Sequence, residues 1–347
     1  MLENIQVQAE SRESILKWIS KEYFDMNGSY IETLDEPPTA LQFSRLAHIS
    51  RPVIIKGFEV PALKRWTDKY ILERMQQRSI SVAVTPNGAA DAVTRGSDGE
   101  LYFAEPHVEQ MTMGSFLSKL TPTAQESTAM PDEVYYLQSQ NGNLYSNSFF
   151  DHSDEDTSEF ESLRPDVPSD ISWCSEAFDR APDAVNLWIG NSTSVTSIHS
   201  DPYENIYTVI RGAKHFTLLP PTEGWCTQER SYPHARYTRP TSGPGLVLTP
   251  SSANTPHVRW SSITDPHLPN TLPPDAHPLE VTLHAGDTLY LPVGWWHHVR
   301  QSDTTIALNW WYDAEFRGMN WVWMNMLRGL GTDAPAQGEE GEKFDNE

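Results

Sequence analysis

Residues 196–207 read TSIHSDPYENIY, and residues 289–299 read LYLPVGWWHHV. His199 and Asp201 in the first stretch are two positions apart, so on a strand both side chains project to the same face. The second stretch places a histidine pair just beyond a predicted strand, and alternation allows only one of the pair to face that point. Two histidines and one carboxylate on a β scaffold form the facial set that binds non-haem Fe(II) and leaves positions open. The pattern therefore predicts a metal site on a β scaffold.

The C-terminal half has the rhythm of an all-β domain. Short apolar runs are separated by glycine turns, which predicts a barrel or sandwich. The predicted strands are residues 185–189, 206–210, 215–219, 279–283, 287–291 and 305–312. Residues 220–278 are dense in Pro, Ser, Thr and Asn, and we expect them to form a long surface insertion. The histidines in this insertion have no strand geometry, so we expect no second metal site there; they are His234, His257, His267 and His277.

The rest of the chain divides into a mixed N-terminal region and a short C-terminal end. Apolar spacing predicts helices at residues 8–24, 40–50, 111–120 and 314–330, and strands at 53–55, 79–84 and 101–103. Residues 150–170 are acidic and Ser-rich, which predicts an exposed loop. The expected organisation is an N-terminal helical and strand region (1–130), a barrel (131–313), a C-terminal helix (314–331) and an acidic disordered tail (332–347).

The net charge of the chain limits the classes of molecule that it is expected to bind. The 347 residues include 25 Lys and Arg against 47 Asp and Glu, a net charge of −22. This charge repels nucleic-acid phosphates and anionic lipid, and favours a partner with a basic segment. No apolar run reaches the roughly 18 residues of a membrane span, and we expect that residues 1–25 do not act as a signal peptide. With only Cys174 and Cys226, we expect an intracellular protein, cytoplasmic or nuclear, without a disulfide framework.

Two further features have alternative interpretations. Lys214, at the start of a predicted strand, is either a cation inside a barrel that holds a dicarboxylate or a hairpin-edge lysine that faces water, which by position alone is commoner. Four tryptophans are either barrel core or substrate-lining, and we expect core for at least two of them. They are Trp295, Trp296, Trp310 and Trp311.

The quoted stretches, together with GAKHF at residues 212–216, resemble the Jumonji-C (JmjC) Fe(II)/2-oxoglutarate oxygenases, in particular the small members of the (3S)-lysyl hydroxylase type. The likeness extends to TPNGAADAV at 85–93, VYYLQ at 134–138 and PDAVNLW at 182–188, and so covers nearly the whole chain. The resemblance implies a mainly β fold with flanking helices. Its core is a double-stranded β-helix (jelly-roll, cupin-like), with an N-terminal α/β extension and a C-terminal helix.

The resemblance also implies roles for individual residues. Fe(II) is bound by His199, Asp201 and His297, while His298 is a neighbour and not a ligand. The cosubstrate 2-oxoglutarate and O2 occupy the open positions. The residues implied for the cosubstrate are Lys214 and Thr196 at the distal carboxylate, the hydroxyl of Tyr136 beside them, and Asn205 and Asn309 near the metal-chelating end.

The function implied by the resemblance is that of a 2-oxoglutarate-dependent dioxygenase that hydroxylates a lysine side chain of a protein substrate and releases succinate and CO2. By the same resemblance the substrate is a developmentally regulated GTP-binding protein. A JmjC histone lysine demethylase ranks second, because no chromatin-reading module accompanies the barrel. A cupin-type iron enzyme or a binding barrel that does not use 2-oxoglutarate remains as a further alternative. The apolar stripe of residues 314–330 predicts a homodimer, with packing on the chain's own barrel as the alternative.

Overall fold

The computed structural model describes residues 11–121, 132–138, 143–145, 158–241, 243, 245–313 and 317–331. Its centre is a sheet in the order β1-β2-β17-β11-β18-β10-β4, to which β16 adds on β11 and β9 adds on β18. These strands are β1 (Glu32–Leu34), β2 (Val53–Ile55), β4 (Ala89–Ala90), β9 (Ala184–Gly190), β10 (Val195–Ser200), β11 (Tyr203–Leu219), β16 (Leu279–His284), β17 (Thr288–Leu291) and β18 (Trp296–Asp313).

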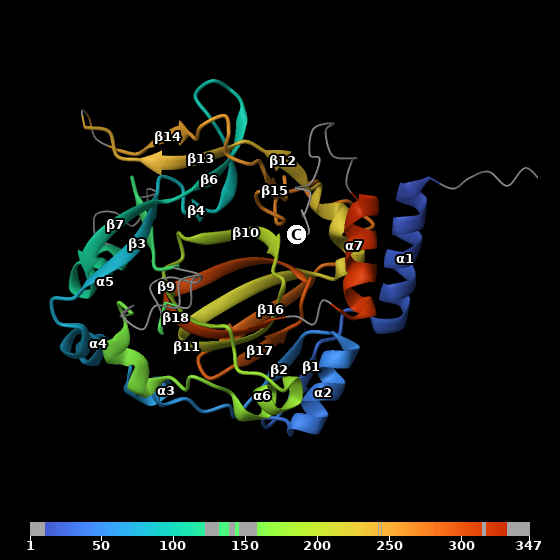
Figure 1. The fold of residues 1–347 in the computed structure, drawn as a ribbon, viewed down its shortest axis with the longest axis horizontal. Helices are drawn as coiled ribbons and strands as arrows, with labels where there is room; N and C mark the ends of the chain where they lie inside the picture. The colour runs from blue at the N-terminus through green and yellow to red at the C-terminus, as the bar shows by residue number, and fades with distance from the viewer. Residues whose placement is uncertain are drawn as a thin grey trace, which may run out of the picture.

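Two long antiparallel strands, β11 and β18, give the core its jelly-roll form. They pair from Tyr203 opposite Asp313 to Leu219 opposite Trp296. Along its length β11 pairs first with β17 and then with β16, while β18 pairs with β10 near its start and with β9 near its end. The expected mainly β, cupin-like core with flanking helices is therefore confirmed (Figure 1).

The prediction of two separate strands at 206–210 and 215–219 is wrong, because both belong to the single strand β11. The register shifts near Gly212, which has φ +78, and a Cβ there would lie 2.3 Å from Thr305 Oγ1. A bulge of this kind bends a strand without ending it. Gly212, which we interpreted as a turn, is therefore a bend within β11. It allows the same strand to pair with β17 on one side of the bend and with β16 on the other.

Three smaller sheets lie outside the barrel. Their strands are β3 (Ser79–Thr85), β7 (His107–Thr112) and β8 (Val134–Tyr136) in one sheet, β5 (Ala92–Arg95), β6 (Leu101–Glu105), β13 (His234–Thr238) and β14 (Val247–Pro250) in the second, and β12 (Arg230–Tyr232) and β15 (Val258–Trp260) in the third. The interpretation of 220–278 as an insertion without strand geometry is wrong, since four of these strands belong to it and His234 begins β13. In Figure 1 they lie over the β10 side of the barrel. The parallel pairing of β13 with β6 joins segments far apart in the chain, which local periodicity cannot reveal.

The helices cover the outside of the sheets. They are α1 (Arg12–Asn27), α2 (Ala40–Ile49), α3 (Pro61–Arg65), α4 (Asp68–Met75), α5 (Met113–Leu120), η1 (Glu161–Asp166), α6 (Ser172–Phe178), η2 (Pro221–Thr227) and α7 (Met319–Gly331). The predicted helix at 111–120 starts late, because Thr112 ends β7 and its side chain caps α5 at Ser115 N. Within the described residues, no helix is both long and apolar enough to cross a membrane.

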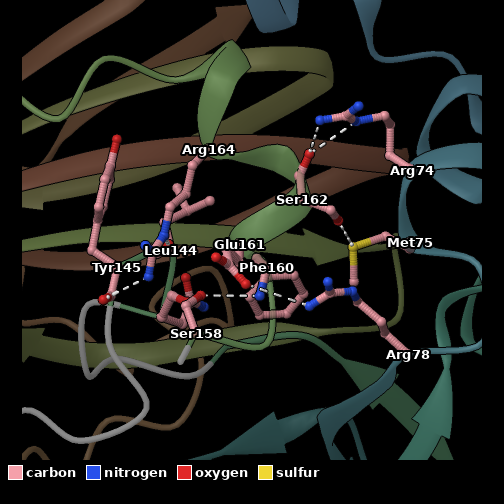
Figure 2. A network of polar contacts seen from close by, with 11 residues as sticks. Arg74, Met75, Arg78, Leu144, Tyr145, Ser158, Phe160, Glu161, Ser162 and Arg164 are labelled. Atoms are coloured by element: carbon pink, nitrogen blue, oxygen red, sulfur yellow. Dashed lines mark hydrogen bonds and ion pairs between the residues drawn. The ribbon is translucent and has the colours of Figure 1, made fainter. Parts of the chain in front are cut away.

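The prediction of an exposed loop at 150–170 is wrong for its described part, residues 158–170. Phe160 and Leu163 are fully buried in the main core. Figure 2 shows how the segment is attached: the Arg164 guanidinium donates to the carbonyl oxygens of Leu144 (2.6 Å) and Tyr145 (2.8 Å). Two arginines of the α4 region, Arg74 and Arg78, hold its other side. The acidic composition of the segment suggested exposure to solvent, but a few apolar side chains within it are buried. The acidic groups next to them form ion pairs with arginines from distant parts of the chain.

The C-terminal helix α7 packs beside α1 and η2 (Figure 1). It retains exposed apolar side chains, which are Met319, Trp321, Val322, Trp323 and Met326. The four tryptophans at 295, 296, 310 and 311 are all buried, so core is confirmed for at least two of them. The predicted tail at 332–347, and residues 150–157 of the predicted loop, lie outside the described residues.

Candidate active site

Strand pairing assembles the predicted metal ligands. His199 is the second-last residue of β10, and antiparallel pairing places it opposite His297 near the start of β18. Asp201 follows β10 directly, and its carboxylate lies 3.5 Å from His199 Nε2 and 3.7 Å from His297 Nε2. One donor atom from each residue lies within 4.8 Å of the others. Among the described residues, no other group of three His, Cys, Asp or Glu side chains meets this spacing.

Both histidines are oriented by backbone carbonyls. His199 Nδ1 lies 2.9 Å from the carbonyl oxygen of Ser197, and His297 Nδ1 lies 3.0 Å from that of Trp295. An Nδ1–H that donates to a carbonyl leaves the Nε2 lone pair available to a metal. Burial, together with the nearby His199, lowers the pKa of His297 to about 4, so this imidazole stays neutral at physiological pH. The set of two imidazoles with available Nε2 atoms and one carboxylate therefore fits Fe(II).

His298 lies apart from this donor group. Its ring is next to His267, with ring centroids 5.7 Å apart, and it is 1% exposed. Within the part of the chain that the structure describes, neither ring nitrogen of His298 has a hydrogen-bond partner. The structure thus places the two histidines in different surroundings, as alternation along β18 requires.

We expect His298→Ala to weaken Fe(II) binding far less than His297→Ala, because only His297 aims a nitrogen at Asp201. Titration of the metal-free protein with Fe(II) under anaerobic conditions measures both variants. A melting curve of each metal-free protein controls for the packing lost at a buried position. Equal losses of metal affinity in two folded variants would contradict the choice of His297 as the ligand.

The donor group opens into a small cavity. Five of its twelve lining residues are Phe, Tyr or Trp, and their rings limit the access of bulk water to the polar groups. The lining residues are Tyr136, Trp188, Thr196, His199, Asp201, Asn205, Tyr207, Phe216, His297, Val299, Asn309 and Trp311. Seven of the eight predicted site residues are in this set, and the eighth, Lys214, contacts one of its members.

Lys214 is an interior lysine, so the alternative of a hairpin-edge lysine in water is wrong. It lies in the middle of β11, is 2% exposed, and donates from Nζ to the Tyr136 hydroxyl at 3.2 Å. Thr196 also hydrogen-bonds to Tyr136. No carboxylate among the described residues forms an ion pair with this ammonium group, and burial lowers its pKa from 10.5 to about 7. A buried cation without an acidic partner, next to two hydroxyls, is suited to an anionic ligand.

The two predicted asparagines form a directed chain of hydrogen bonds in the cavity wall. Trp188 Nε1 donates to Asn309 Oδ1 at 2.6 Å, and Asn309 Nδ2 donates to Asn205 Oδ1 at 3.1 Å. This chain fixes which side of each amide is oxygen and which is nitrogen. Asn205 is its last acceptor, so its own amide nitrogen remains a donor for a ligand in the cavity.

Trp260 is a site residue that the sequence analysis missed. It belongs to β15 within the segment 220–278, yet its ring stacks on that of His199 with centroids 5.6 Å apart and planes 7° apart. Its Nε1 donates to Ser197 Oγ at 2.9 Å. No local signal could have identified it, because its position depends on how β12 and β15 fold back over the barrel.

Comparison with known proteins adds to this geometry. A family model described as "Cupin-like domain" matches residues 38–318. The chain is 35% identical to "Lysine-specific demethylase JMJ32" of Arabidopsis thaliana, over 87% of each chain. It is 37% identical to "Bifunctional peptidase and (3S)-lysyl hydroxylase JMJD7" of Homo sapiens, over 82% of this chain and 84% of the relative. "JmjC domain-containing protein E" of Dictyostelium discoideum is 31% identical, over 84% and 86% respectively.

Proposed function

Since this chain belongs to the cupin-like JmjC family, we propose that it is an Fe(II)- and 2-oxoglutarate-dependent dioxygenase that hydroxylates a lysine side chain of a protein. The observation that carries the proposal is Lys214, a buried lysine without an acidic partner, held against the wall of the cavity that contains the donor group. A generic iron cupin has no use for such a lysine. A dicarboxylate cosubstrate does, because its distal carboxylate neutralises the buried ammonium group.

Each group of residues has a task in this proposal. His199, Asp201 and His297 hold the metal, and bound Fe(II) supplies the activation of O2 that drives decarboxylation of 2-oxoglutarate and hydroxylation of a C–H bond. Lys214, Thr196 and Tyr136 bind and orient the distal carboxylate of the cosubstrate.

The remaining cavity residues complete the site. Asn205 and Asn309 lie near the metal-chelating end of the cosubstrate, where Asn205 donates a hydrogen bond and Asn309 orients Asn205. The aromatic walls, including Trp188 and Tyr207, exclude water and so strengthen these polar contacts.

The proposed substrate is a protein with a basic segment, which the net charge of −22 supports. A developmentally regulated GTP-binding protein is our first candidate, as the resemblance to the (3S)-lysyl hydroxylase type implies. The name of the human relative supports lysyl hydroxylation as the reaction. Histone lysine demethylation is the second candidate function, and the name of the Arabidopsis relative supports its lysine-demethylation part.

One assay separates these candidates. Lysine-rich peptides from the candidate GTP-binding protein and methylated histone peptides are incubated with enzyme, Fe(II) and 2-oxoglutarate, and their masses are measured. Hydroxylation adds about 16 Da, whereas removal of a methyl group subtracts about 14 Da. The same reactions with Asp201→Ala provide the blank. Metal binding without any turnover of 2-oxoglutarate would contradict both candidates and favour an iron cupin or a binding barrel.

We also propose that the protein forms a homodimer through α7, because Met319, Trp323 and Met326 remain exposed on a helix already packed against α1 and η2. Trp323→Glu places a charge in that face, and we expect it to halve the mass measured by light scattering. Asn320→Glu is the matched control, since it adds the same charge to the same helix at a polar, exposed position. A wild-type protein that is already monomeric, or an unchanged dimer in Trp323→Glu, would contradict this proposal.

A further inference from the structure

The two histidines of the donor group are held alike by backbone carbonyls, but an indole ring stacks on His199. We propose that Trp260 is a positioning residue for His199, which means that it sets the metal affinity of the site without touching the metal. This inference rests on the proposed function, because it assumes that His199 binds a metal ion.

Trp260 acts on His199 in two ways. Its ring lies parallel to the imidazole, at an angle of 7°, and so blocks rotation of that ring out of its plane. Its Nε1–H donates to the hydroxyl of Ser197, whose own hydroxyl donates to the carbonyl oxygen of Asp91 at 2.7 Å. The carbonyl of Ser197 is the acceptor for His199 Nδ1. The indole thus holds both the ligand ring and the residue that orients it.

Trp260 is itself held firmly. Pairing of β15 with β12 places it opposite Arg230, and its ring packs against Phe103 of β6 with centroids 4.8 Å apart. The adjacent Arg259 forms an ion pair with Glu229, a carboxylate that is 2% exposed and also binds Arg328 of α7. The indole thus belongs to one small sheet and packs against a strand of another. An indole fixed in this way can restrain the neighbouring imidazole, whereas a mobile surface indole could not.

A purely structural role for Trp260 makes a different prediction. Trp260 belongs to a small apolar cluster with Val93, Phe103, Tyr232 and Val258. If it only filled this cluster, its loss would lower the melting temperature and leave the metal affinity of a folded protein unchanged. A positioning role lowers the metal affinity itself, because the free histidine must then be ordered when the metal binds.

The test measures binding of Co(II), a spectroscopic substitute for Fe(II), to the full-length protein by calorimetry and by visible absorption. We expect Trp260→Leu to weaken Co(II) binding by about tenfold. Trp260→Phe keeps an aromatic ring but loses the donor to Ser197, and we expect a loss of about threefold. Val258→Ala is the matched control, since it removes side-chain volume from the same cluster without contacting His199.

The outcomes separate the inference from the function on which it rests. A wild-type protein that does not bind Co(II) at all overturns the proposed metal site. A wild-type protein that binds, together with a folded Trp260→Leu within twofold of its affinity, overturns the positioning role alone. An equal loss in Val258→Ala also overturns it, because general packing would then be the cause. Should Trp260→Leu not fold, wild-type affinity in Trp260→Phe overturns the inference.

Discussion

We expect Asp201→Ala to lower turnover of 2-oxoglutarate by roughly a hundredfold or more. The substitution removes the single carboxylate of the donor group and leaves only two imidazoles, which hold Fe(II) weakly. Loss of a residue that is hydrogen-bonded to a metal ligand already lowers metal affinity by about 10- to 100-fold. Loss of a ligand itself should lower the affinity further. Succinate formation and the iron content of the purified protein are the two measurements.

Asp275→Ala is the matched control for this prediction. Asp275 is an exposed aspartate whose ion pair is with Lys17 of α1, away from the donor group. We expect this variant to retain wild-type turnover and iron content. Stoichiometric iron together with full turnover in Asp201→Ala would contradict the assignment of the metal site.

We expect Lys214→Ala to raise the KM for 2-oxoglutarate by roughly a hundredfold or more while Fe(II) binding persists. Lys214 is fully enclosed and contacts Tyr136, so the distal carboxylate of the cosubstrate would lose its only cationic partner among the described lining and contact residues. Leaving one partner of a buried ion pair alone costs about 3–5 kcal/mol, and about 1.4 kcal/mol corresponds to tenfold in affinity. Steady-state kinetics with varied 2-oxoglutarate, and a separate Fe(II) titration, measure the two effects.

Lys214→Arg is the informative companion variant. It keeps the positive charge, but the guanidinium is planar and longer than the ammonium group, so we expect it to recover only part of the lost affinity. A wild-type KM in Lys214→Ala would mean that the cosubstrate is anchored elsewhere, and the proposed dicarboxylate site would fail.

The same lysine predicts how cosubstrate binding depends on pH. Burial lowers the pKa of Lys214 to about 7, so in the empty cavity the group is mostly neutral at pH 8 and mostly charged at pH 6. A bound carboxylate favours the ammonium form and raises this pKa. Binding of 2-oxoglutarate therefore takes up a proton at pH 8 and little or none at pH 6. Calorimetry in two buffers of different ionisation enthalpy measures the uptake, and Lys214→Ala should abolish it.

The metal-binding pattern was readable in the sequence for chemical reasons. Few residue types can bind Fe(II), and the spacing of His199 and Asp201 has a direct consequence on a strand. The structure brings both side chains together with His297 at the predicted place. The roles of Lys214, Thr196 and Tyr136 came from family resemblance, since nothing in a lone lysine distinguishes an interior cation from one at a hairpin edge.

The jelly-roll core was likewise readable, because apolar runs and glycine turns are local features. The sequence could not reveal that β11 runs through Gly212 without ending, because a bulge and a turn carry the same glycine signal. Nor could it reveal the packing of Phe160 and Leu163, which acidic neighbours concealed and which depends on arginines elsewhere in the chain.

The sequence by itself determined which side chains could bind a metal, where strands alternate, and the overall negative charge. Tertiary structure alone decided what surrounds that chemistry. Trp260 reaches His199 only because β13 pairs with β6 and β15 pairs with β12, which folds the segment 220–278 over the barrel. Hydrogen bonds between distant strands are made by backbone groups that every residue carries, so they leave no mark in the order of side chains.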